Sequence, residues 1–381
     1  MKINIENFKS IEKLALDLAP LTILIGPPAG GKSNILDAIM LTGYFNRIRL
    51  VEKEYASYIG LEPIKYVIRF EKSKELFYRY DPTRLIKIEY LDGDEVFSYQ
   101  IYFEGGTLRQ RIQTPRYIPT YLSWNMLEYG EKMLGRLVKE LERLRLFDAR
   151  LYSYDRFSLS SRECESDFTC GFYARLQGLH AKDYPFNVLS EFAWNALSIC
   201  RQAGDLIDNL NSLLQQYVGE RFQLSITRYG VVLLDNYIDV ELTSVSDAVF
   251  RALYYLLGLR SAKTYTKLYG LEGRMFLLFE EPEAHIFPYF LNLLVDAIED
   301  AVSLMNIVIA THNPILVSLL WDRVPDLKIY YVYRERAGGT KAVEIDKEKF
   351  AQELKLVDDL MFMTAQEILD KYAIRSEEVE H

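Results

Sequence analysis

The sequence has few cysteines and no long apolar run. Cys164, Cys170 and Cys200 are the three cysteines among 381 residues, and no two of them form a CxxC pair. Such usage fits neither a disulfide framework nor a four-cysteine zinc site, and it is typical of a reducing compartment. Apolar stretches such as residues 275–279 are far shorter than the roughly 18 residues of a membrane span. The start, MKINIENFKS, lacks the apolar segment of a secretory signal, so we expect a cytoplasmic protein with no membrane partner.

The sequence also has fewer positively charged than negatively charged residues. The chain has 45 Lys and Arg residues against 54 Asp and Glu residues, which gives a net charge of −9. Such a chain does not attract nucleic acid through its average field, so DNA binding would need a local basic patch. Apolar residues make up 49% and charged residues 26%, as in globular proteins with a substantial core. At about 150 residues per domain, the length predicts two to three units or one large two-lobed α/β body.

Hydrophobic patterns predict two β-rich parts separated by a helical one. Strands are predicted at 2–8, 13–19, 21–25, 275–279 and 306–310, with further hairpins from 222 to 242 and from 328 to 344. Residues 64–114 alternate repeatedly, including Ile68 and Phe70, with turns at Asp92-Gly93 and Gly105-Gly106 that predict an antiparallel sheet. Helical periods indicate an amphipathic helix at 32–44 and further helices at 134–144, 190–217 and 246–264. The predicted segments are 1–117, a helical insertion at 118–217, 218–350, and C-terminal helices and tail at 351–381.

Residues 26–33 read GPPAGGKS and match the pattern G-x-x-x-x-G-K-[ST]. Glycines let the backbone wrap an anion so that N–H groups point at phosphates, and the following helix adds partial positive charge. Lys32 would reach the β- and γ-phosphates, and the Ser33 hydroxyl would coordinate Mg²⁺. A chance match is expected in only about 1–2% of chains of this length. The predicted nucleotide-binding residues are Gly26, Pro27, Pro28, Ala29, Gly30, Gly31, Lys32, Ser33 and Asn34.

Acidic residues directly follow the predicted core strand at 275–279. Ligands bind at the carboxyl ends of strands in doubly wound sheets, so these acids should lie beside the phosphate loop. Glu280 would hold Mg²⁺, and Glu281 would be the general base that polarises the attacking water. We expect Glu283, in contrast, to be a solvated acid of the loop.

His312 follows the next predicted core strand, at 306–310. At that strand end it would lie near Glu281 and could donate a hydrogen bond to the γ-phosphate. A purely structural histidine is the alternative.

In this order, these segments resemble the ABC-type ATPase superfamily, and more narrowly its soluble branch with RecF, the SMC-like DNA-repair ATPases and the OLD-type ATPases. The resemblance rests on IENFKS (5–10), GPPAGGKSN (26–34), LLFEEPEAHIFP (277–288) and IVIATHNP (307–314), and it covers residues 1–115 and 220–345. It implies a two-lobed ATPase head, with a central mostly parallel sheet, an antiparallel β-subdomain and a helical insertion. ATP and Mg²⁺ are the implied cofactors.

The resemblance also implies contacts that the motifs alone do not indicate. Ser246 matches the signature serine that contacts the γ-phosphate bound by a partner subunit, although an ordinary helix N-cap is the alternative. Ala248 stands where the family usually has glycine, which would crowd that approach. Lys9 and Ser10 match the stretch that approaches the nucleotide base. The Mg²⁺-sensing glutamine cannot be placed, and Gln110 and Gln113 are only candidates.

The implied function is an ATP-hydrolysing switch in which two copies sandwich two ATP molecules head to tail. DNA maintenance or defence with a separate nuclease-like or toxin-like effector is the expected setting, since 69 residues after His312 are too few for an appended nuclease domain. The Ala248 variant keeps open an ATP-binding regulatory subunit with little hydrolysis. A transporter nucleotide-binding subunit fits less well with the long β-rich first lobe. A lone P-loop kinase or GTPase is disfavoured because no NKxD motif is present.

Overall fold

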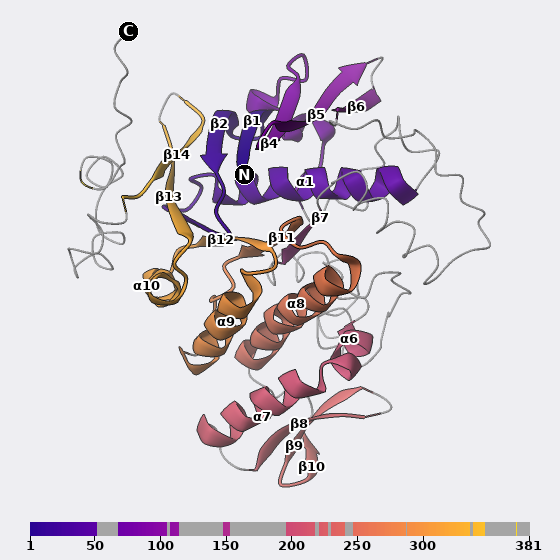
Figure 1. The fold of residues 1–381 in the computed structure, drawn as a ribbon, viewed down its shortest axis with the longest axis vertical. Coiled ribbons are helices and arrows are strands. Elements are labelled where there is room, and N and C mark those ends of the chain that lie inside the picture. Colours follow the sequence, from indigo (N-terminus) through magenta and orange to yellow (C-terminus); the bar gives the residue numbers. More distant parts are fainter. Residues whose placement is uncertain are drawn as a thin grey trace.

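The structure is a computed structural model that describes residues 1–51, 68–104, 107–113, 148–152, 196–217, 221–227, 230–240, 247–286, 288–335, 338–346 and 371. Within these ranges the strands form a six-stranded, a five-stranded and a three-stranded sheet (Figure 1). The predicted helix at 134–144, the Gly105-Gly106 turn, Ser246 and nearly all of the predicted C-terminal segment lie outside the described residues.

The central sheet has the strand order β14-β13-β3-β12-β11-β7. Its strands are β3 (Leu21–Ile25), β7 (Asp148–Tyr152), β11 (Met275–Glu280), β12 (Asn306–Thr311), β13 (Leu327–Arg334) and β14 (Thr340–Glu344). All neighbours pair in parallel except β13 and β14. Every residue of β3 and β11 is buried, as expected for strands covered on both faces. The predicted mostly parallel sheet is confirmed.

A second, antiparallel sheet has the order β2-β1-β4-β5-β6. Its strands are β1 (Lys2–Phe8), β2 (Ile11–Asp17), β4 (Ile86–Asp92), β5 (Glu95–Glu104) and β6 (Thr107–Gln113). The predicted antiparallel subdomain is therefore confirmed, and Asp92 pairs with Glu95 across the expected turn. The alternation at Ile68 and Phe70 was misleading, because these residues lie outside any strand, just before two 3₁₀ turns, Ser73–Leu76 and Tyr78–Tyr80.

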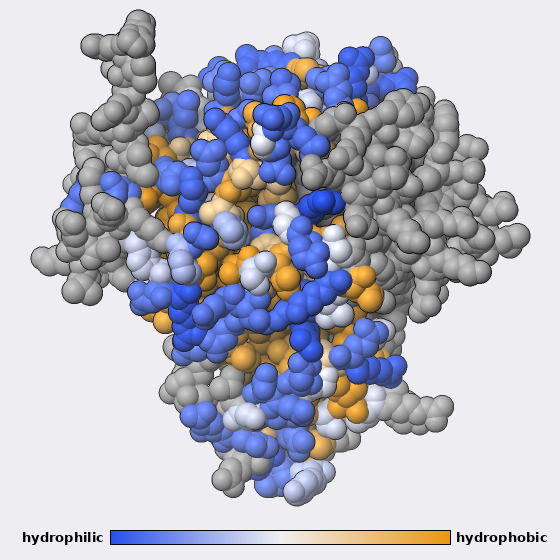
Figure 2. Space-filling view, viewed as in Figure 1, coloured by the Kyte–Doolittle hydropathy of each residue, from blue (hydrophilic) through white to orange (hydrophobic). Residues whose placement is uncertain are grey.

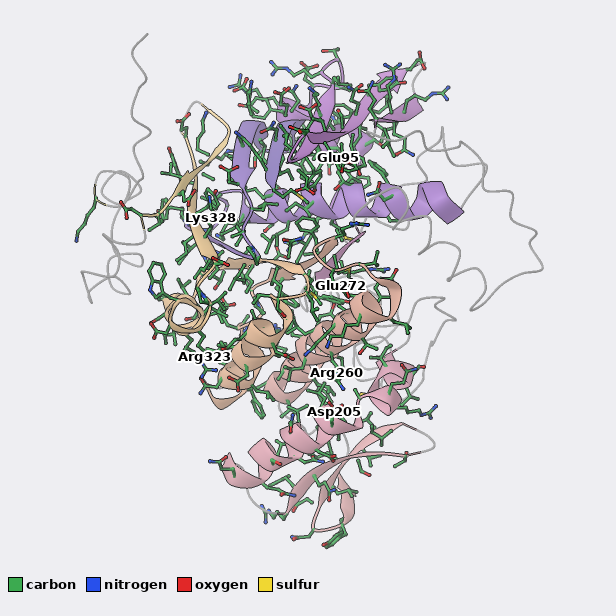
Figure 3. All side chains as sticks on the ribbon, in the orientation of Figure 1. Glu95, Asp205, Arg260, Glu272, Arg323 and Lys328 are labelled. Atoms are coloured by element: carbon green, nitrogen blue, oxygen red, sulfur yellow. The ribbon has the colours of Figure 1, made fainter. Side chains whose placement is uncertain are left out.

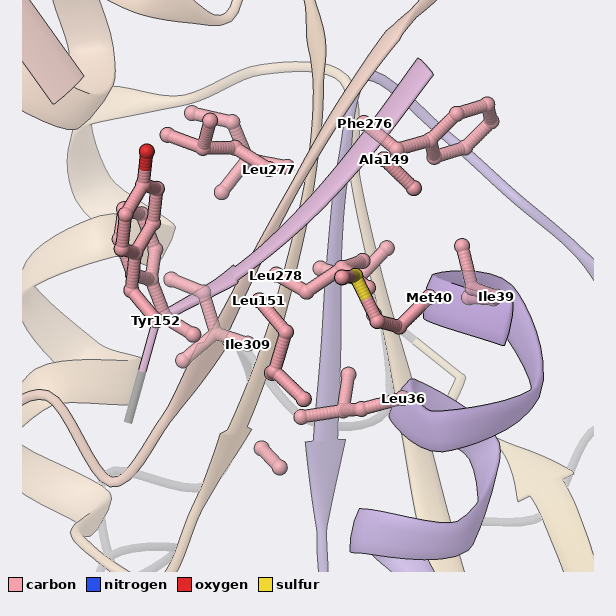
Figure 4. Close-up of a cluster of buried hydrophobic side chains, with 14 of the residues drawn as sticks. Leu36, Ile39, Met40, Ala149, Leu151, Tyr152, Phe276, Leu277, Leu278 and Ile309 are labelled. Atoms are coloured by element: carbon pink, nitrogen blue, oxygen red, sulfur yellow. The ribbon is translucent and has the colours of Figure 1, made fainter. Parts of the chain in front are cut away.

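Helix α1 (Lys32–Val51) runs between the two sheets (Figure 1). Every residue from Ile35 to Gly43 is buried, so the helix is not amphipathic as predicted. A helix covered by sheets on opposite sides buries its whole circumference, which removes the polar stripe of a surface helix. Leu36, Ile39 and Met40 of α1 pack toward β7 and β11 (Figure 4).

Strand β7 lies inside the range predicted as a helical insertion and pairs in parallel with β11. Two residues of β7, Ala149 and Tyr152, lie so close to α1 and α8 that each faces a glycine there. A Cβ on Gly43 of α1 would lie 2.5 Å from the Cβ of Ala149, and a Cβ on Gly258 would lie 3.2 Å from the ring of Tyr152. The insertion therefore contributes an edge strand to the central sheet, whereas its predicted boundaries remain predictions.

Helices α8 (Asp247–Tyr269), α9 (Pro288–Ala301) and α10 (Pro314–Arg323) lie on the other side of the central sheet from α1 (Figure 1). The described part of the predicted helix at 190–217 is two helices, α6 (Ala196–Gln202) and α7 (Gly204–Tyr217). Helix α7 packs on the three-stranded sheet of β8 (Phe222–Ile226), β9 (Val231–Asp235) and β10 (Ile238–Val240). An ion pair of 2.8 Å between Asp205 and Arg260 joins α7 to α8 (Figure 3).

The described surface in Figure 2 is mostly hydrophilic, with hydrophobic side chains visible in narrow areas between the elements. None of the helices in the described ranges is long and apolar enough to cross a membrane.

Candidate functional site

The phosphate loop connects β3 to α1 and passes close to β13. Gly26 has φ = +149°, and a Cβ there would collide with the carbonyl oxygen of Val332. Gly31 has φ = +108°, and a Cβ there would collide with the side chain of Thr340 on β14. The glycines are therefore required by conformation and by close contact, in addition to any need of a bound phosphate.

The Lys32 side chain is folded back onto its own loop. Its ammonium group donates hydrogen bonds to the carbonyl oxygens of Gly26 at 2.8 Å and Pro27 at 3.0 Å. Burial lowers the pKa of Lys32 from 10.5 to about 8, although Glu281, Glu280 and Glu283 oppose this shift. The ammonium group is thus held inside the loop that a phosphate group would enter.

Glu280 ends β11 and is buried, with 7% of its surface exposed. The guanidinium of Arg69 lies 2.5 Å from its carboxylate and forms an ion pair with it. The Glu280 carbonyl accepts a hydrogen bond of 3.1 Å from the hydroxyl of Tyr255 on α8. The strand end is thus fixed, and the carboxylate is held opposite a cation.

Glu281 and His312 lie together, as predicted from the adjacent strand ends. Nε2 of His312 is 3.3 Å from Oε1 of Glu281, and Nδ1 is 3.5 Å from the Lys32 ammonium. In these positions Nε2 can donate a hydrogen bond to Glu281, and Nδ1 faces the Lys32 ammonium. The hydrogen bond from His312 lowers the pKa of Glu281 despite partial burial, which keeps the carboxylate ionised near neutral pH. The Glu281 backbone has φ = +46°, a conformation that non-glycine residues adopt rarely.

Glu283 is not the solvated acid that we predicted. It is 8% exposed, and the Thr311 hydroxyl at the end of β12 donates a hydrogen bond to its carboxylate. Burial raises the pKa of Glu283 above the usual value. The sequence suggested otherwise because three acids close together normally face water.

These groups surround one cavity of about 520 Å³. The phosphate loop forms one wall, and the ends of β11 and β12, with Glu280, Glu281 and His312, form the facing wall. Its described lining residues are Ser10, Pro28, Ala29, Gly30, Gly31, Lys32, Ser33, Asn34, Arg69, Glu280, Glu281, Ala310, His312 and Arg334. The structure therefore brings the predicted phosphate-binding, metal-binding and catalytic residues to one place, although their roles remain predictions.

A second cavity of about 740 Å³ adjoins the first and shares five lining residues with it: Ser10, Ser33, Asn34, Arg69 and Arg334. Lys9 lines this second cavity, but its ammonium is held by Asp37 at 2.6 Å and by the carbonyl oxygen of Arg69 at 3.2 Å. The Asn34 amide donates to the Ser10 hydroxyl at 2.6 Å. Lys9 and Ser10 thus lie beside the phosphate loop, and their approach to the nucleotide base remains a prediction.

Gln110 and Gln113 lie on β6 and line neither cavity. Ser246 lies outside the described residues, immediately before α8.

The sequence analysis did not identify Arg69, Thr311 or Arg334 as parts of the site. Arg69 gave no signal, because it belongs to no motif and lies between Ile68 and Phe70 in a segment whose alternation predicted a strand. Thr311 could have been suspected from its place between the core strand and His312. Arg334 ends β13, and its place beside the phosphate loop depends on the pairing of β13 with β3.

Comparisons with known proteins give one family match and matches to solved structures. The AAA ATPase domain family matches residues 1–169. No curated protein matches the chain. An SMC head bound to the C-winged helix domain of ScpA has a TM-score of 0.52 at 15% identity, covering 92% of this chain and 99% of that chain. An SMC head with an extended coiled coil, bound to the C-terminal domain of ScpA and derived from Pyrococcus furiosus, has a TM-score of 0.50 at 14% identity, covering 94% and 98%.

At these identities the structural likeness shows the fold, which is that of an SMC head. The family model matches an ATPase domain over residues 1–169, the part of the chain that contains the phosphate loop. The family match and the SMC-head fold agree with the resemblance to RecF/SMC-like P-loop ATPases that the motifs indicated.

Proposed function

We propose that this chain hydrolyses ATP in the cavity between the phosphate loop and the ends of β11 and β12, with Mg²⁺ as cofactor. The observation that carries the proposal is that Lys32 and His312, 280 residues apart in the chain, lie 3.5 Å apart beside Glu281. A fold alone does not define a reaction, whereas this set of groups combines phosphate binding with water activation.

The backbone N–H groups of the loop and the N-terminus of α1 would bind the β- and γ-phosphates. Lys32 would exchange its two loop carbonyls for phosphate oxygens, which restores its full charge. Glu281 would accept a proton from the water that attacks the γ-phosphorus, as the bond to the β-phosphate oxygen breaks. His312 would orient Glu281 through Nε2 and lie close to the transferred phosphoryl group.

The residues present fit a magnesium ion. Glu280 is a buried carboxylate that already faces a cation, the Arg69 guanidinium, and Ser33 lines the same cavity. Carboxylate and hydroxyl oxygens are ligands that Mg²⁺ prefers. Glu280 and Ser33 would hold the ion, which would neutralise charge on the phosphates when bound.

The site is open on one side, which supports a head-to-tail dimer. The side chains of His312 and Glu281 are 36% and 41% exposed, respectively. A second copy would cover them and exclude water, with Ser246 as its candidate contact. The SMC heads in the two similar structures are bound to domains of ScpA. By analogy, we propose a separate effector protein and a role in DNA maintenance or defence.

Calorimetry with ATP and an assay of phosphate release from the full chain test this proposal. Lys32→Ala should weaken ATP binding about 100-fold, since it removes a charge-assisted contact worth roughly 3 kcal/mol. Lys328→Ala is the matched control, because Lys328 pairs with Glu344 at 3.1 Å and does not line the cavity (Figure 3). Unchanged ATP affinity in Lys32→Ala would overturn the assignment. Tight ATP binding without phosphate release would favour a regulatory subunit.

Light scattering tests the dimer. With ATP present, Glu281→Gln should double in molar mass, because ATP binds and is not consumed. A constant molar mass at saturating ATP would exclude the ATP-induced dimer. It would not contradict the proposed hydrolytic site.

A further inference from the structure

Glu283 is a buried carboxyl group to which the proposed reaction gives no role. One of its oxygens accepts the Thr311 hydroxyl, and the other, Oε2, is buried without a hydrogen-bond partner. Burying a carboxyl group is costly unless it is compensated by the contacts it makes. A solvated acid or an apolar residue would avoid that cost, so the specific contact with Thr311 requires an explanation.

Thr311 connects Glu283 to a helix start. While its hydroxyl donates to Glu283, the same oxygen accepts a hydrogen bond of 2.8 Å from the backbone N–H of Asn313. The Asn313 side chain then caps α10, accepting from the backbone N–H of Ile315 at 2.8 Å and of Leu316 at 3.4 Å. Glu283, Thr311, Asn313 and the first turn of α10 thus form one continuous chain of hydrogen bonds.

His312 lies between the two middle members of this chain, Thr311 and Asn313. The hydrogen bond between Thr311 and Glu283 also lies just beyond the last backbone pairing of β11 and β12. The last paired residues of β11 and β12 are Glu280 and Ala310, and one more backbone bond follows, from the Glu281 N–H to the Ala310 carbonyl at 2.8 Å. Beyond that point, the Glu283–Thr311 contact is a side-chain link between the two strand ends.

We propose that Glu283 is a positioning residue that fixes the His312 backbone through Thr311 and Asn313, and so holds the His312 ring against Glu281. This inference rests on the proposed hydrolytic site, because it assigns Glu283 to the same reaction. A displacement of about 1 Å in a catalytic group can reduce a rate by 100-fold, so loss of this positioning should lower the rate of hydrolysis measurably.

The test compares threonine variants in the full chain. Thr311→Val removes the hydroxyl with little change in shape, and we expect kcat to fall about 10- to 100-fold with little change in ATP affinity. Thr311→Ser keeps the hydroxyl and should retain kcat within about threefold. Thr22→Val is the matched control, because Thr22 is a buried threonine of the same sheet whose hydroxyl bonds only within its own turn, to the backbone of Ala19.

A second pair of variants addresses Glu283 itself. Glu283→Gln retains an oxygen that can accept the Thr311 hydroxyl and should behave like Thr311→Ser. Glu283→Leu should behave like Thr311→Val. The kcat of the double variant Glu283→Leu/Thr311→Val should be no lower than that of either single variant. Both changes break the same series of hydrogen bonds, so their effects should not add.

The His312 ring provides a readout independent of turnover. With four histidines in the chain, the ring signal in a nitrogen-correlated NMR spectrum can be assigned by its loss in His312→Asn. We expect Thr311→Val to move this signal and Thr22→Val to leave it in place. An unmoved signal, or a kcat of Thr311→Val equal to that of Thr22→Val, overturns the positioning role. If Glu281→Gln also hydrolyses ATP at the parental rate, the proposed function fails instead.

Discussion

The two walls of the cavity are built in different ways. The phosphate-loop wall is one continuous segment, and its shape depends on backbone conformation at glycines such as Gly26 and Gly31. The facing wall joins the ends of two strands, and its shape depends on side-chain contacts, such as His312 with Glu281 and Thr311 with Glu283.

This difference determines what a substitution in each wall should affect. A glycine replacement alters the path of the chain, so it threatens the fold as well as binding. A side-chain replacement on the facing wall removes a chemical role or a contact that positions one, with a smaller effect on the fold. Binding should therefore depend mainly on the first wall, and turnover mainly on the second.

The largest effect is expected from Glu281→Gln. Loss of a general base should lower kcat about 10²- to 10⁴-fold, while ATP affinity stays close to that of the parent. Phosphate release and ATP calorimetry on the same preparation check both parts. A parallel loss of affinity would show that the facing wall also binds ATP and would remove the contrast between the walls.

Gly26→Ala tests the loop wall. The added methyl group collides with the Val332 carbonyl oxygen at a φ of +149°, so the free energy of unfolding should fall by about 2–4 kcal/mol. Ala29→Gly is the control in the same loop. Because Ala29 already has φ = +60°, glycine relieves strain there, and the change should stay below about 1 kcal/mol. Denaturant unfolding measures both, and equal effects would contradict the backbone argument.

Arg69→Met probes the cation that faces Glu280. Because the Arg69 side chain is 48% exposed, the ion pair is screened, and we expect a loss of only about 1 kcal/mol without metal. Mg²⁺ should raise the melting temperature of this variant more than that of the parent, since the ion can take the place of the guanidinium. Arg334→Met is the control from the same cavity. A similar response to Mg²⁺ in both variants would exclude competition at Glu280.

The smallest effect concerns pH. In the nucleotide-free protein Lys32 has a pKa of about 8, lowered by burial, so its charge is present below that pH and lost above it. Bound phosphates raise the pKa, so binding takes up a proton above pH 8. ATP affinity should fall by less than about tenfold from pH 7.5 to 8.5. Calorimetry in two buffers of different ionisation enthalpy detects the proton, and Lys32→Arg should abolish it.

The same lowered pKa affects stability with a definite sign. Between about pH 8 and the usual lysine value of 10.5, the unfolded chain binds more protons at Lys32 than the native chain does. The contribution of Lys32 to stability therefore rises with pH across this interval.

The loop wall was predictable because strand, loop and helix are adjacent in sequence. The apolar run of β3, the glycines and Lys32 all lie within residues 21–32, and the structure reproduces the β3 bounds. The acids and His312 were predictable as strand-end residues. That they meet depends on the pairing of β11 with β12, which the sequence does not state.

Other features could not be predicted from local pattern. Strand β7 has only five residues and contains Arg150, which is fully buried, so neither its length nor its hydropathy indicated a core strand. Its place depends on Gly43 and Gly258 in distant helices. Glu283 was mispredicted for a similar reason, because its burial depends on Thr311, 28 residues away.

The interleaving of distant segments in the central sheet has a consequence for biosynthesis. A ribosome adds roughly 5–20 residues per second, so the 280 residues between Lys32 and His312 take about 15–60 s to make. During that interval β3 has neither β12 nor β13 beside it, and its apolar edges stay open to chaperones. The complete nucleotide site therefore forms late, only after β12 has paired with β3.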